Sequence, residues 1–230
     1  MGDCSRLEKE SEMMGTVRQY RFIYLFAALL LTTFVAPVIG DYKILRIVFD
    51  IFLSMIFFSG CFAVSRSRYV PWIAIALSVP MLASIWVGYF GGRIPRLDLI
   101  GDIFGVLYFG LIAVVILGFI FSTKHVSSDI IIASLVVYLL FGIMWGFSYQ
   151  VLELLQPGSF RAPDGFFDQA GSGFMYYSFI TLTTIGYGDV TPISGIAQSF
   201  SQLEGIVGQS YMAVLVARLV GLHVAEGTRE

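Results

Sequence analysis

The chain has 230 residues, of which 57% are hydrophobic and only 13% are charged, and its mean hydropathy is +0.82. Because an average soluble domain carries about 25% charged residues, this composition excludes a disordered chain and an ordinary soluble enzyme. The net charge is −2 and the 14 Lys and Arg residues are scattered, so we expect no nucleic acid as a partner. Cys4 and Cys61 have no spacing that would suggest a disulfide or a metal site. The composition therefore predicts a protein of the lipid bilayer.

Six stretches are apolar enough and long enough to cross a bilayer, since a spanning helix needs about 20 residues. Four are uncharged, one has Asp50 near its start, and the last has Glu204 near its middle. We predict spanning helices over residues 22–40, 47–64, 69–92, 103–123, 130–152 and 190–217. A cleaved signal peptide is the alternative for the first stretch, because RQYR precedes an apolar run that ends in small residues.

The stretch between the last two spans, residues 156–189, is rich in Gly, Pro and Phe and is too broken to cross as one helix. Its later part predicts a short helix over about residues 172–183. Gly186 and Gly188 then alternate with Ile185 and Tyr187, so the backbone can take a positive φ at every second residue at little steric cost. Successive carbonyl groups can then point the same way and form a ladder of cation ligands.

The run Thr183-Thr184-Ile185-Gly186-Tyr187-Gly188-Asp189 resembles the signature of the tetrameric potassium channels, and the resemblance extends over about residues 130–221. It implies an all-α integral membrane protein with six transmembrane helices, a re-entrant pore helix and a selectivity filter. It also implies that K⁺ loses its hydration shell to the carbonyl oxygens of Thr184, Ile185, Gly186 and Tyr187 and to the Thr184 hydroxyl, with Gly188 completing the filter. Because one ladder cannot surround an ion, a homotetramer is implied. The expected partners are K⁺, the bilayer and further copies of the chain, with no cofactor besides bound K⁺.

On this resemblance we divide the chain into a cytoplasmic tail (1–21), a four-helix unit that resembles a voltage sensor (22–125), a pore domain (126–221) and a short cytoplasmic tail (222–230). With the N-terminus inside, nine Lys and Arg residues lie on the cytoplasmic side and five outside. We therefore expect both termini in the cytoplasm and the protein in the plasma membrane.

The resemblance also suggests how the filter is supported. In this family an acid at the position of Asp189 hydrogen-bonds an aromatic residue of the pore helix, and Tyr176 and Tyr177 are the candidates. The alternative is that Asp189 only caps a turn. Thr181 and Thr183 are further candidates for filter support.

Glu204 is the only acid inside the last span, where a charge costs about 2.5–3.5 kcal/mol. We expect a buried, hydrogen-bonded carboxyl that supports the filter, within reach of Ser178 or Thr181, and its protonation state is left open. The alternatives are an acid that faces the cavity and concentrates cations, and a structural role toward lipid or a neighbour.

Gly205 and Gly208 form a small-residue pair in the last span, which is typical of close helix packing. By resemblance Gly208 matches the position where many pore-lining helices bend, so we interpret this pair as a hinge. A gate is expected among the apolar residues that follow at helical spacing and at the histidine after them: Met212, Leu215, Val216, Leu219 and His223. A simply solvated histidine is the alternative to proton gating at His223.

A voltage sensor needs several Arg or Lys residues at three-residue spacing on its fourth helix, and residues 103–123 contain none. The resemblance, together with this missing charge, implies a passive, weakly voltage-dependent potassium channel. We expect no enzyme, because the two His residues lie near loops or tails and Glu204 has no evident catalytic partner. A potassium-translocating subunit that needs a separate regulatory partner, and a non-selective cation channel, are the alternatives.

Overall fold

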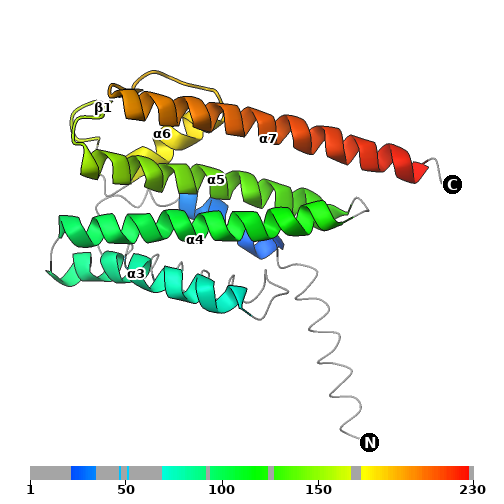
Figure 1. Ribbon diagram of the computed structural model, residues 1–230, viewed down its shortest axis with the longest axis horizontal. Helices are drawn as coiled ribbons and strands as arrows, with labels where there is room; N and C mark the ends of the chain where they lie inside the picture. The colour runs from blue at the N-terminus through cyan, green and yellow to red at the C-terminus, as the bar shows by residue number, and fades with distance from the viewer. Residues whose placement is uncertain are drawn as a thin grey trace, which may run out of the picture.

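A computed structural model describes residues 22–34, 47, 51, 69–91, 94–123, 127–166 and 172–227. In chain order, this part contains α3 (Val70–Gly91), α4 (Pro95–Ser122), α5 (Ser128–Leu155), β1 (Phe160–Arg161), α6 (Ser172–Leu182), β2 (Thr191–Pro192) and α7 (Gly195–Gly227), after a shorter apolar helix, Phe22–Phe34. The two strands pair antiparallel, with Phe160 opposite Pro192. Figure 1 shows α3, α4, α5 and α7 stacked in this order, with the short helix α6 between α5 and α7.

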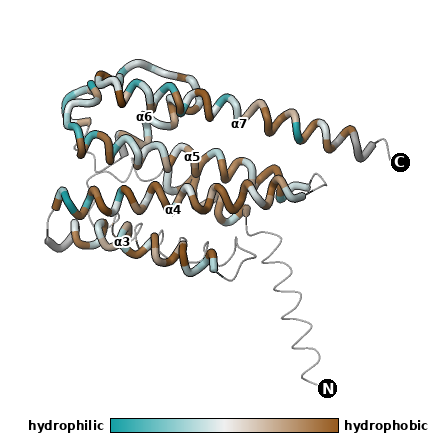
Figure 2. Tube along the Cα trace, viewed as in Figure 1, coloured by the Kyte–Doolittle hydropathy of each residue, from teal (hydrophilic) through white to brown (hydrophobic). Residues whose placement is uncertain are grey.

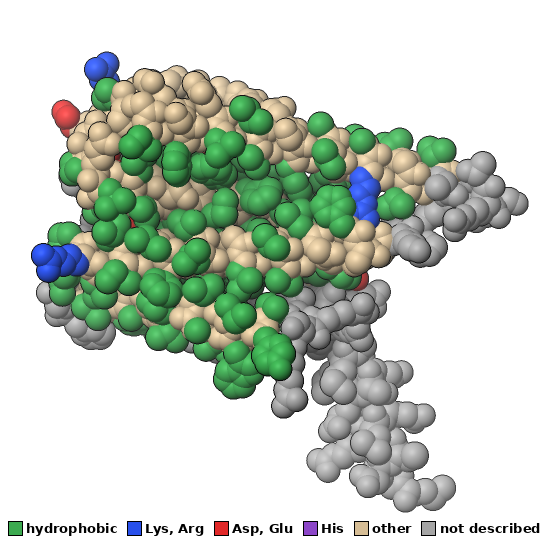
Figure 3. Space-filling model, viewed as in Figure 1, with side chains coloured by type: hydrophobic (Ala, Val, Ile, Leu, Met, Phe, Trp, Pro, Cys, Tyr) green, Lys and Arg blue, Asp and Glu red, His purple; other side chains and the backbone are tan. Residues whose placement is uncertain are grey.

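Within the described ranges, four helices are long and apolar enough to cross a membrane: Val70–Gly88, Pro95–Ser122, Ser128–Leu155 and Gly195–Leu222. Hydrophobic residues recur along the length of these helices (Figure 2), while the charged side chains on the face drawn in Figure 3 lie near the helix ends. The chain is thus a helical membrane protein. The first predicted span is described only over Phe22–Phe34, and the second, residues 47–64, lies outside the described residues apart from positions 47 and 51.

Three of the predicted helix boundaries are wrong. Helix α4 begins at Pro95 and not at Ile103, because proline has the φ of a first helical residue and does not need the missing N–H there. Helix α7 begins at Gly195 and not at residue 190, because Thr191 and Pro192 pair with β1. It then continues to Gly227, beyond the predicted end at residue 217.

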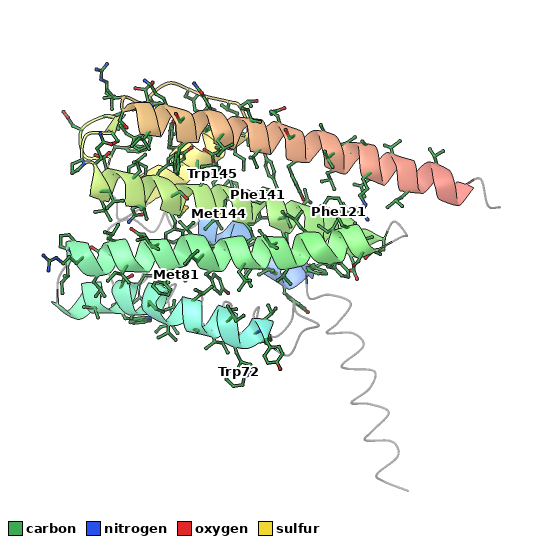
Figure 4. All side chains as sticks on the ribbon, in the orientation of Figure 1. Trp72, Met81, Phe121, Phe141, Met144 and Trp145 are labelled. Atoms are coloured by element: carbon green, nitrogen blue, oxygen red, sulfur yellow. The ribbon has the colours of Figure 1, made fainter. Side chains whose placement is uncertain are left out.

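Among the residues that the structure describes, buried side chains form two clusters. The larger joins helix Phe22–Phe34 with α3, α4 and α5, and includes Phe109, Ile116 and Val136. The smaller surrounds α6 and includes Trp145, Tyr149 and Tyr177. Figure 4 shows Phe141 and Trp145 on α5, whose rings make edge contacts with aromatic residues of α7.

Helix α6 lies directly against α5 because α5 carries glycine at two positions one turn apart. A Cβ at Gly142 would overlap the Phe179 ring, and a Cβ at Gly146 would lie 2.5 Å from Met175 Sδ. Small residues at this spacing allow two helices to approach closely within a membrane. This contact sets the position of α6 and of everything attached to its C-terminal end.

Candidate functional site

The segment 183–189 follows directly from the C-terminal end of α6 and is held to it by backbone hydrogen bonds. The N–H of Thr184 donates to Thr181 O at 3.0 Å, and the N–H of Gly186 donates to Ile180 O at 3.1 Å. From α5, the hydroxyl of Tyr138 donates to Leu182 O, at the end of α6, at 3.1 Å. The segment therefore cannot shift without moving the end of the helix.

The backbone of this segment alternates between two conformations. Thr184, Gly186 and Gly188 have φ values of 60°, 53° and 77°, while Ile185 and Tyr187 between them do not have positive φ. The alternation predicted at Gly186 and Gly188 is thus present. Thr184 adds a third residue with positive φ to the alternation, which the sequence did not indicate because β-branched residues rarely adopt positive φ. This alternation is the geometry that allows successive carbonyl groups to face one side of the chain.

Side chains of the segment are uncovered within the single chain. Ile185 is 56% exposed and Tyr187 is 71% exposed, although both are large and apolar or aromatic. Such exposure is expected of residues that meet another surface.

Asp189 accepts a hydrogen bond from the Tyr176 hydroxyl at 2.7 Å through Oδ2, and one from the Val190 N–H at 3.1 Å through Oδ1. The hydrogen bond to Asp189 raises the pKa of Tyr176 to about 12. Of the two candidate donors, Tyr176 is therefore the partner of Asp189. Tyr177 instead shares a hydrogen bond with Ser201 of α7 at 2.7 Å.

Glu204 of α7 is completely buried and contacts two hydroxyl groups from other helices. The Tyr149 hydroxyl of α5 donates to Glu204 Oε2 at 2.5 Å, and Ser178 Oγ of α6 lies within hydrogen-bond distance of Glu204 Oε1. Ser178 was one of the two expected partners, and the second partner is Tyr149 rather than Thr181. Tyr149 was missed because it lies far from Glu204 in the sequence, and the only signal was that a buried acid needs donors.

Residues 130–223 match a protein family described as ion channel. This part of the chain is an ion channel domain. The match begins inside α5 and ends inside α7, so it includes α6, the 183–189 segment and the Glu204 contacts. No curated protein and no solved structure matches the chain.

Behind α6, the channel domain has a group of aromatic rings that the sequence analysis did not identify. Tyr149 contacts Tyr177 with ring centroids 5.0 Å apart, and Phe160 contacts Tyr149, Phe174 and Tyr177 at 5.2–5.4 Å. Edge-to-face pairs of this kind add to the stability gained by burial. They join β1, α5 and α6 into one packed unit.

Hydrogen bonds anchor the chain that follows α5, and through it the chain that follows the 183–189 segment. Glu153 at the end of α5 accepts hydrogen bonds from the N–H groups of Gly158 and Ser159, at 2.7 and 3.0 Å. Ser159 O accepts a hydrogen bond from the Ile193 N–H at 2.8 Å. The chain that leaves the segment is thereby anchored to α5.

The inner helix of the channel domain, α7, touches the end of α6 at Gly208. A Cβ at this position would lie 2.7 Å from Leu182 Cδ1 and 2.8 Å from Leu182 O, whereas a Cβ at Gly205 would meet nothing within 4 Å. Close packing therefore accounts for Gly208. The helix is continuous through both glycines, and the hinge stays a prediction.

The residues predicted to form the gate differ in their surroundings. Met212 and Val216 are 39% and 55% exposed, Leu215 is half-buried, and Leu219 packs against the larger core cluster. The side chain of His223 lies outside the described part.

Near the end of α7, Arg218 contacts the end of α4. Its Nη2 donates to Thr123 O at 2.9 Å, and its guanidinium lies 4.7 Å from the centre of the Phe121 ring, which is labelled in Figure 4. A cation beside the C-terminal carbonyl groups of a helix is electrostatically favourable. This contact joins the inner helix to the helices that precede the channel domain.

Proposed function

We propose that the chain is one subunit of a homotetrameric, potassium-selective channel of the plasma membrane, with both termini in the cytoplasm. K⁺ passes down its gradient through a filter made by residues 184–188 of four subunits. The observation that carries this proposal is the alternation of positive φ at Thr184, Gly186 and Gly188, directly after a helix inside an ion channel domain.

The chemistry of this backbone fits a dehydrated monovalent cation. The carbonyl oxygens of Thr184, Ile185, Gly186 and Tyr187, with the Thr184 hydroxyl, supply neutral ligands in place of water. Helix α6 ends at this segment, and its C-terminal end carries about half a negative elementary charge. Four such ends around an axis favour cations over anions.

The surface of α7 supports the four-fold assembly. Its apolar residues Ile196, Leu203 and Ile206 are 54%, 51% and 63% exposed, and lipid alone could cover these. The same helix also exposes the polar residues Gln202 and Gln209, which lipid does not favour. A ring of four copies that encloses a water-filled cavity provides suitable surroundings for both kinds of residue.

The proposal is tested by reconstituting the purified full chain into planar bilayers with a K⁺ gradient and Na⁺ as the opposing cation. We expect a reversal potential close to the K⁺ equilibrium potential. A reversal potential that treats Na⁺ and K⁺ equally would indicate a non-selective cation channel. If the purified chain gives no current and a membrane extract restores it, the chain would be a translocating subunit with a separate partner.

A pair of matched variants tests whether residues 184–188 are the filter. Gly186 and Gly165 both have positive φ, and a Cβ at either would meet nothing within 4 Å, so alanine causes similar backbone strain at both. We expect Gly186→Ala to abolish the preference for K⁺, because one row of ligands is displaced. Gly165→Ala, in the turn that follows β1, should keep it. Equal behaviour of the two variants would contradict the assignment.

A further inference from the structure

The buried acid Glu204 is surrounded by groups that carry no charge at neutral pH. Its carboxyl contacts Ser178 and Tyr149, and the titratable groups that face it are Tyr138 and Tyr149 of α5 and Tyr177 of α6. Within the described residues, no Lys or Arg forms an ion pair with it. An ionised carboxylate would therefore be buried without a compensating charge, which is strongly unfavourable.

The hydrogens available to this cluster indicate its protonation state. Ser178 Oγ lies 2.7 Å from Gly142 O and is also within hydrogen-bond distance of Glu204 Oε1. A serine hydroxyl has one hydrogen and cannot donate to both oxygens. With Glu204 ionised, one of these two short contacts would join two oxygen atoms with no hydrogen between them.

One additional proton satisfies every contact. If Oε1 is protonated, Glu204 donates to Ser178 Oγ, Ser178 donates to Gly142 O, and Tyr149 donates to Oε2. The cluster then has three donors for three acceptors, and none of its buried polar atoms is left unpaired.

We propose that Glu204 carries a proton at neutral pH and that, in this form, it is a positioning residue that ties α7 to α5 and α6 behind the filter. The hydrogen bond between Glu204 and Ser178 acts on the filter through α6, because Ser178 lies in that helix and Ile180 O of the same helix accepts a hydrogen bond from the N–H of Gly186. The protonation state stands on the geometry alone, whereas the effect on the filter rests on the proposed function.

Infrared spectroscopy of the reconstituted full chain tests the protonation directly. We expect a C=O stretching band of a protonated carboxyl at neutral pH that is lost in Glu204→Gln and kept in the matched control Glu153→Gln. Since Tyr149 donates to Oε2, the carbonyl oxygen of the acid, Tyr149→Phe should shift this band to higher frequency. A band that neither Glu204→Gln nor Tyr149→Phe changes, or no band in the unmodified chain, would overturn the proposal.

Ion flux separates this proposal from the proposed function. The amide of Glu204→Gln can donate to Ser178 and accept from Tyr149, so we expect its K⁺/Na⁺ permeability ratio and its conductance to be preserved. Glu204→Ala and Ser178→Ala break the bond, and removal of one hydrogen bond should shift the balance between conducting and non-conducting filters by about 2- to 10-fold.

A large fall in conductance in Glu204→Gln with unchanged selectivity would overturn the proposal and indicate an acid that faces the cavity. The carboxyl band without any K⁺-selective flux would leave the protonation standing and overturn the proposed function.

Discussion

At the C-terminal end of the 183–189 segment, the hydrogen bond between Tyr176 and Asp189 is exposed to solvent. The phenol donates only while it is protonated, and the bond raises its pKa to about 12 from the ordinary value of about 10. Its contribution to stability is therefore complete below about pH 10 and is lost as the pH rises through about 12. Channel activity across the physiological range should not depend on this tyrosine's titration.

We predict that Asp189→Asn lowers the pKa of Tyr176 toward its ordinary value, because the negative charge and the acceptor are both weakened. Phenolate absorbance, titrated in the unmodified chain, Asp189→Asn and Tyr176→Phe, measures this shift by difference. Tyr177→Phe serves as the control, since Tyr177 bonds to Ser201 and not to Asp189. An unchanged titration in Asp189→Asn would contradict the assigned bond.

Sequence reasoning reached some of these residues and missed others for physical reasons. Asp189 and Gly186 lie in a local pattern, where spacing along the chain determines the geometry. The partner Tyr149 is brought to Glu204 only by the packing of α5 against α6 and α7. The positive φ of Thr184 follows from the bonds between the segment and α6, which residue type does not reveal.

At the scale of helices, the contact between α7 and the end of α6 depends on the absence of a side chain at Gly208. We predict that Gly208→Ala destabilises the protein by about 1–3 kcal/mol, because the added methyl group meets a backbone oxygen that cannot move freely. Gly205→Ala has open space and gains helix propensity, so its stability should be equal or higher. Thermal unfolding of both variants in detergent measures the difference. Similar stability in the two variants would contradict close packing as the role of Gly208.

By the resemblance drawn from the sequence, α4 corresponds to the fourth helix of a voltage sensor, and its one basic residue, Arg96, lies next to its first residue. Each elementary charge that crosses the membrane field contributes about 2.3 kcal/mol per 100 mV. We therefore predict a weak dependence of open probability on voltage. Gating-current measurements that give about three or more elementary charges per subunit would contradict this prediction.

The types and positions of the helices were more predictable than their ends. Hydropathy placed α3, α5 and α7, since burial in lipid selects apolar residues over a length set by the bilayer. The first residues of α4 were missed because Arg96, Asp98 and Asp102 interrupt the apolar run, although they continue the same helix. The start of α7 depends on the pairing of Thr191 with β1, which lies about 30 residues earlier in the chain.

At the scale of the whole molecule, the proposal requires four identical subunits around one pore. We predict that native mass spectrometry of the full chain in mild detergent gives four times the subunit mass.

When unmodified and Gly186→Ala chains are mixed equally, only about one tetramer in sixteen lacks the variant, so K⁺-selective current should fall far below half. A fall to half would indicate that each chain conducts alone.

The exposed glutamines of α7, Gln202 and Gln209, also bear on how the protein is made. A newly translated subunit that enters the bilayer alone presents their amides to lipid tails, where each unsatisfied polar group costs several kcal/mol. We expect such orphan subunits to be recognised by membrane quality control and degraded quickly. Pulse-chase labelling should then show a short-lived early pool and a long-lived late one, and the rate at which subunits find one another would set the yield of the protein.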